Sequence, residues 1–112
     1  MLIVSLVTVP RDSFSQQLDR EIDSLMNVLK TAAEDTNKVN TLNALNKLYC
    51  GTALKAETKG YFDKALQLAQ KLNFKRGIAN AYFNFGLNYD LQGNYSEALK
   101  NQTAPWEIIR KH

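Results

Sequence analysis

The apolar residues of this chain recur at the period of an α-helix in one stretch after another, and no other feature restricts the fold as much. Spacings of three and four residues place side chains on one face of a helix. Two such stripes are Leu18, Ile22, Leu25 and Leu29, and Ile78, Tyr82, Phe85 and Tyr89. Beyond the first ten residues no run of alternating β-branched residues competes with this pattern. The sequence therefore predicts an all-α fold.

Turn signals divide the helical pattern into five segments. Helices are expected over residues 16–33, from 36 toward Gly51, from about 57 to 72, over 75–91, and from 95 onward. Asp35 or Thr36 can cap the second helix. The expected turns are Asn73-Phe74 and Gln92-Gly93-Asn94, and Asn94 followed by Glu97 resembles a capping box. Pro105 predicts a kink or an early end of the last helix near Ala104.

Residues 1–15 form a separate, signal-peptide-like segment. The run MLIVSLVTVP is shorter than the roughly 20 apolar residues that a membrane span needs. Ser13 and Ser15 supply small residues before a cleavage site at Gln16. No Lys or Arg precedes the apolar run, as expected if the leader is truncated. An exported or periplasmic protein would follow. The alternative is a cytoplasmic chain in which this segment is a hydrophobic tail or a short helix that packs on the first repeat.

Composition argues against several classes of function. The formal net charge is +3, and the basic residues are scattered along the chain, so nucleic-acid binding is not expected. Cys50 is the single cysteine and His112 the single histidine, so no internal disulfide, zinc site or His-based catalytic triad can form. Cys50 is expected to be a small half-buried residue, although a reactive thiol or an intermolecular bridge is also compatible with the sequence. No glycine-rich phosphate loop is present, and neither enzymatic activity nor a cofactor is expected.

The stretch Ala79–Leu99, ANAYFNFGLNYDLQGNYSEAL, resembles a tetratricopeptide repeat. The matching features are Tyr82, Phe85-Gly86, Tyr89, Gly93 with Tyr95, and Ala98. Gly86 and Ala98 would let the two helices of the pair approach closely, and the aromatic residues would fill the space around them. An earlier copy lies at an offset of 40 residues, with Asn46 in place of Gly86 and Thr58 in place of Ala98. The usual period is about 34 residues.

The resemblance implies a short right-handed solenoid of antiparallel helix pairs over residues 16–112. It would comprise an extra helix (16–33), repeat one (36–73) and repeat two (75–110). The runs LNALNKL and KALQLAQKLNFKRGIANAY also resemble exported sensory regions of signalling proteins from Bacteroidota-like bacteria. That likeness suggests a truncated sensory fragment of a histidine kinase, a cyclase or a transcription regulator. Two further hypotheses are an independent adaptor and a spacer that self-associates through its exposed end helices.

Tetratricopeptide repeats bind peptides or partner proteins on a concave face formed by the first helix of each pair. The resemblance places on that face seven candidate binding residues, Asn40, Asn43, Lys47, Asn80, Phe83, Leu87 and Asp90. It also places Cys50 there and makes Leu91 a further candidate. Helical spacing independently marks Phe83, Leu87 and Leu91 as a second apolar stripe. Such a stripe meets a partner or packs on the adjacent first helix. The sequence therefore predicts a protein-binding scaffold without a membrane span.

Overall fold

In the computed structural model the backbone is described for residues 2–50, 52 and 54–111, and side chains for 16–50, 52, 54–103 and 107. Within these residues the chain forms five α-helices and no β-strand. They are α1 (Leu2–Thr31), α2 (Thr36–Tyr49), α3 (Lys55–Lys71), α4 (Lys75–Leu91) and α5 (Tyr95–Lys111). The all-α fold expected from the apolar stripes is confirmed.

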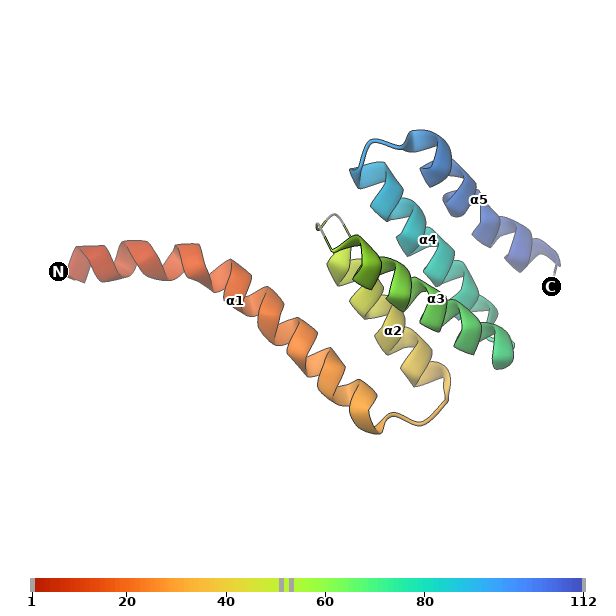
Figure 1. The fold of residues 1–112 in the computed structure, drawn as a ribbon, viewed down its shortest axis with the longest axis horizontal. Helices are drawn as coiled ribbons and strands as arrows, with labels where there is room; N and C mark the ends of the chain where they lie inside the picture. Colours follow the sequence, from red (N-terminus) through yellow and green to blue (C-terminus); the bar gives the residue numbers. More distant parts are fainter. Residues whose placement is uncertain (1, 51, 53, 112) are drawn as a thin grey trace.

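Helices α2 to α5 lie side by side with alternating directions, while α1 leaves the bundle at an angle (Figure 1). Helix α2 contacts α1, α3 and α4, and α4 contacts α2, α3 and α5. The two helices that begin at Thr36 and Lys75 are therefore neighbours in space, although α3 separates them in sequence. Their contact gives α2 and α4 a shared surface.

The turns on either side of α4 share one backbone design. Asn73 and Gly93 have positive φ angles of 53° and 81°. In each turn the following amide donates back to a carbonyl in the preceding helix, at 2.8 Å from Phe74 and 2.9 Å from Asn94. This arrangement ends a helix and reverses the chain within three residues. Both turns lie where glycine and asparagine predicted them.

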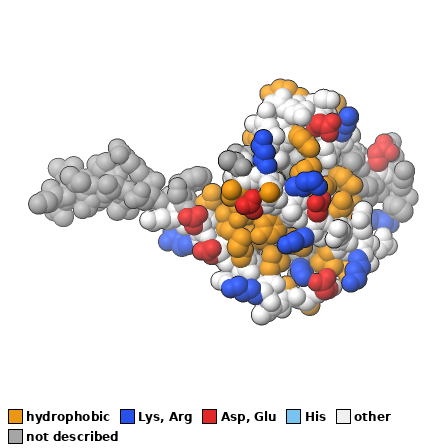
Figure 2. Space-filling model, viewed as in Figure 1, with side chains coloured by type: hydrophobic (Ala, Val, Ile, Leu, Met, Phe, Trp, Pro, Cys, Tyr) orange, Lys and Arg blue, Asp and Glu red, His pale blue; other side chains and the backbone are white. Residues whose placement is uncertain are grey.

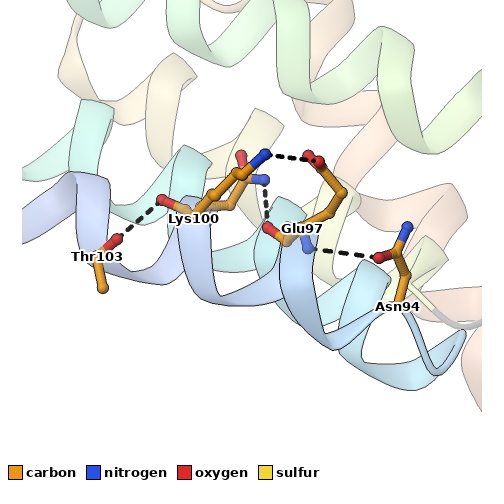
Figure 3. A network of polar contacts seen from close by, with 5 residues as sticks. Asn94, Glu97, Lys100 and Thr103 are labelled. Atoms are coloured by element: carbon orange, nitrogen blue, oxygen red, sulfur yellow. Dashed lines mark hydrogen bonds and ion pairs between the residues drawn. The ribbon is translucent and has the colours of Figure 1, made fainter.

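Side-chain caps begin two of the helices. Asp35 Oδ1 accepts a hydrogen bond of 3.1 Å from the backbone amide of Lys38, so Asp35 rather than Thr36 caps α2. Asn94 Oδ1 accepts from the amide of Glu97 at 3.4 Å (Figure 3). The Glu97 carboxylate lies 3.2 Å from Lys100 Nζ. Of the two hydrogen bonds of the expected capping box, the one from the Glu97 amide to the Asn94 side chain is present. The reciprocal one is replaced, because the Asn94 amide donates to the carbonyl oxygen of Tyr89.

The core lies between α2, α3 and α4. Its buried members are Val39, Leu42, Phe62, Ala65, Leu68, Ala69 and Ala81. Phe62 of α3 stacks on Phe85 of α4, with ring centroids 4.2 Å apart, and meets Tyr82 edge-on at 5.6 Å. The aromatic stripe of α4 thus fills the space against α3, as its spacing predicted.

Small residues allow α4 and α5 to approach closely. A Cβ atom on Gly86 would lie 2.9 Å from Gln102 Cγ and 3.1 Å from the carbonyl oxygen of Ala98. Ala98 itself is 3% exposed. The predicted contact between Gly86 and Ala98 is confirmed, because a Cβ atom at position 86 would already crowd the Ala98 carbonyl oxygen.

The start of the first helix and the end of the last helix differ most from expectation. Helix α1 begins at Leu2 rather than at Gln16, and the side chains of the proposed leader, residues 1–15, lie outside the described residues. The expected early end of the last helix near Ala104 is wrong, because α5 continues through Pro105 to Lys111. A proline removes one backbone hydrogen bond and crowds one turn, and helical geometry can resume beyond it.

Within the described chain no helix has both the length and the hydropathy needed to cross a bilayer.

Candidate functional site

A hollow of about 500 Å³ lies between α2 and α4. We name it the α2–α4 groove. Its lining residues are Asn40, Asn43, Ala44 and Lys47 from α2, and Asn80, Phe83, Asn84 and Leu87 from α4. The spacing of three or four residues along each helix places each set on one helical face. The two faces meet because α2 and α4 are in direct contact.

The groove brings together six of the seven site residues that the sequence singled out. Asp90 is the exception: it is exposed and does not line the hollow. Cys50, the C-cap of α2, donates a hydrogen bond from Sγ to the carbonyl oxygen of Asn84, so the end of α2 lies beside Asn84 of α4. Asp90 comes six residues later in α4, beyond the end of α2. Asp90 therefore lies beyond the end of the groove.

Sequence reasoning missed two lining residues, Ala44 and Asn84. Asn84 follows Asn80 by four residues, and Ala44 follows Asn40 by the same interval. The helical period could therefore have found both. Ala44 is small and Asn84 is polar, so neither residue belongs to the apolar stripes from which the helix faces were identified.

Two asparagines join the helices at the floor of the groove. Asn43 Nδ2 donates to the carbonyl oxygen of Gly77 at 3.1 Å, and Asn84 Nδ2 donates to the carbonyl oxygen of Asn43 at 3.2 Å. Helical carbonyls can accept a second hydrogen bond of this kind, since each oxygen has two lone pairs. These amide groups hold α2 against α4 and fix the width of the groove.

Cys50 lies beside this floor as a half-buried, free thiol. Its Sγ–H donates to the carbonyl oxygen of Asn84 at 3.2 Å. Burial raises the pKa of the thiol to about 11, although the positive charge of Lys47 opposes the change. At neutral pH the group is therefore protonated and a poor nucleophile. This fits the structural role expected of Cys50 and argues against a reactive thiol.

Several side chains that line the groove are exposed to solvent. Phe83 is 51% exposed, so about half of this side chain remains open to solvent beside α2. Asn40, Asn80 and Lys47 are also exposed, and Leu87 is half-buried. The groove thus offers an apolar surface, amide donors and acceptors, and one cation.

Within the residues that the structure describes, no group of three His, Cys, Asp or Glu side chains is placed to hold a metal ion. Comparison with protein-family models, curated proteins and solved structures finds no match to this chain.

Proposed function

We propose that this chain is a non-catalytic protein-interaction scaffold of the tetratricopeptide type, which binds an extended peptide segment of a partner protein in the α2–α4 groove. The observation that carries the proposal is the half-exposed ring of Phe83 in a hollow that also contains exposed amide side chains. Large exposed apolar side chains beside polar groups are typical of contact sites for other proteins.

The helix arrangement supports the tetratricopeptide assignment. Two helix pairs, α2 with α3 and α4 with α5, follow one another, and the first helices of the pairs contact each other. Equivalent helices begin at Thr36 and Lys75, and at Lys55 and Tyr95. A repeat in which the first helices of successive pairs share one surface presents that surface to a ligand.

The chemistry of the groove favours an extended peptide. The amide side chains of Asn40 and Asn80 each carry donors and an acceptor, which match the N–H and C=O groups of a peptide backbone. The exposed face of Phe83 can take an apolar side chain of the ligand. Lys47 can pair with a carboxylate at one end. A peptide of this kind needs no pocket deeper than the groove provides.

Selection from a library of displayed random peptides tests the proposal. Peptides selected on the wild-type chain are expected to lose at least tenfold in affinity for Phe83→Ala, about 1.4 kcal/mol, because the aromatic anchor is removed. Isothermal titration calorimetry measures the affinities. Asn80→Ala is expected to weaken binding several-fold through the loss of one amide.

Leu99→Ala is the matched control, because Leu99 is 63% exposed on α5 and lies outside the groove lining. Its affinity for the selected peptides should equal that of the wild type. The proposal is wrong if no peptide is selected, or if Phe83→Ala and Leu99→Ala bind the selected peptides equally well.

A further inference from the structure

A second hollow, of about 500 Å³, is lined by residues of α1, α2 and α3 and of the connection between α1 and α2. We name it the basic pocket. Its lining residues are Leu29, Glu34, Lys38, Leu42, Lys64, Gln67, Leu68 and Lys71. Its volume is within the range of about 300–1,000 Å³ that small-molecule sites occupy. Figure 2 shows that exposed apolar side chains and charged side chains of both signs lie side by side on one face of the molecule.

The floor of the basic pocket is apolar and belongs to the core. Leu42 and Leu68 are 3% and 6% exposed, and both are members of the buried cluster between α2, α3 and α4. Leu29 of α1 packs against the same cluster. A floor held by the core keeps its shape without a ligand, so an apolar group could bind there without ordering the protein first.

The rim of the pocket has an excess of positive charge. Three lysines surround the single carboxylate of Glu34, which pairs with Lys38 at 2.6 Å. Within the described residues Lys64 and Lys71 form no ion pair, and Lys64 Nζ lies 5.7 Å from the centre of the Tyr61 ring. The ammonium groups of Lys64 and Lys71 therefore have no carboxylate in direct contact among the described residues.

The N-terminus of α2 lies at this rim and carries both signs of charge, because Asp35 caps the helix and Lys38 follows in its first turn. Lys38 lies in the first turn of α2, where the helix dipole is positive and a cation is unfavourable. The pKa of Glu34 is lowered, first by the hydrogen bond from Lys38 and then by the charges of Lys38 and Lys71. An anion in the pocket would meet this positive field directly.

We propose that the basic pocket binds a small organic anion with an apolar body, of the medium-chain carboxylate class. The carboxylate would pair with Lys64 and Lys71, and the hydrocarbon chain would lie along the partly exposed Leu29, above the small exposed edges of Leu42 and Leu68. A purely inorganic anion would leave this apolar surface uncovered, and a neutral hydrocarbon would leave the lysines without a carboxylate. The lysines of the lining favour a negatively charged group, and its leucines favour an apolar one. A small molecule that carries both, an amphiphilic monoanion, fits the pocket best.

The basic pocket is separate from the α2–α4 groove. The two hollows share no lining residue. On α2, the residues Lys38 and Leu42 lie on the opposite side of the helix from Asn40, Asn43 and Lys47, by the 3.6-residue period. A ligand of the basic pocket would therefore leave the peptide groove open.

Titration of the intact chain with decanoate, below its micellar concentration, tests the inference. Calorimetry is expected to show saturable binding, and backbone amide shifts in NMR spectra are expected around Lys38, Lys64 and Lys71. Acetate, which lacks the apolar body, and decanol, which lacks the charge, should each bind at least tenfold more weakly. Decanol binding as tight as that of decanoate would overturn the proposal.

The double variant Lys64→Gln/Lys71→Gln is expected to lose at least tenfold in decanoate affinity. Lys59→Gln is the matched control on the same helix, because Lys59 is exposed, pairs with Asp63 and does not line the pocket. Circular dichroism checks that both variants fold. Equal decanoate affinity in the two variants, or amide shifts confined to the α2–α4 groove, would refute the assignment.

Discussion

Asn46 of α2 is fully buried, and among the described residues neither its Nδ2 nor its Oδ1 has a hydrogen-bond partner. In the repeat alignment this residue occupies the place of Gly86, where the helices of the second pair approach closely. An unsatisfied buried amide costs about 1–3 kcal/mol. The first helix pair therefore carries a destabilising group at the position where the second pair has the smallest residue.

Replacement of this amide should stabilise the protein. Asn46→Leu keeps a side chain of similar size and removes both unpaired polar atoms, so the free energy of unfolding is expected to rise by about 1–2 kcal/mol. Urea denaturation followed by circular dichroism measures it. Asn46→Asp, which adds an ionisable group at the same site, should destabilise. Comparable losses in the two variants would mean that the amide makes hydrogen bonds that favour folding.

At the scale of the element, two glycines inside helices have different surroundings. A Cβ on Gly77 of α4 would lie 2.7 Å from Val39 Cγ1 of α2 and 2.5 Å from Phe74 Cδ2. Val39 is fully buried and β-branched, so it has little freedom to move. A Cβ on Gly60 of α3 would meet nothing within 4 Å. Gly77 thus sets the separation of α2 and α4, and Gly60 only weakens its own helix.

Substitution by alanine should therefore have opposite effects at the two positions. Gly60→Ala is expected to raise the free energy of unfolding by about 0.5–1 kcal/mol, through better helix propensity. Gly77→Ala is expected to lower it by about 1–3 kcal/mol, because the added methyl group overpacks the contact with Val39. Urea unfolding of both variants provides the comparison. A change of the same sign in both would contradict the close approach of α2 and α4.

At the scale of the whole molecule, the helices are unequally supported. Within the described residues α1 contacts only α2, and α5 contacts only α4. Helices α2, α3 and α4 contact one another and share the core. The free energy of local opening is lowest where few buried apolar contacts are lost. The three central helices should therefore form the most stable unit, and the groove between α2 and α4 belongs to it.

Hydrogen exchange measures this order directly. Amides in the middle of α2, α3 and α4 are expected to exchange at least tenfold more slowly than those of α1 and α5, under conditions where exchange reports the opening equilibrium. Mass spectrometry or NMR spectroscopy can follow the individual segments. Uniform protection across all five helices would show instead that the chain opens as a single cooperative unit.

The sequence alone predicted the helices and most of the candidate site. The bounds of α4, Lys75–Leu91, match its predicted range, because its apolar stripe ends at turn residues on both sides. The resemblance to tetratricopeptide repeats placed six groove residues on one face, and helical spacing by itself supported only Phe83 and Leu87 among them. Asp90 lies outside the groove because the groove ends where α2 ends, which periodicity within α4 cannot show.

Local patterns determined the helix positions, the turns at Asn73 and Gly93, and the aromatic stripe of α4, because these depend on residues three or four apart. Only the tertiary structure decided how helices meet. The basic pocket draws Leu29, Lys38 and Lys71 from three helices, and no single stretch of sequence marks them as a group. The contact of Gly77 with Val39 likewise depends on how α4 packs on α2. The helical period determines which residues share a face of one helix. Which other helix that face contacts is determined by the packing of the whole chain.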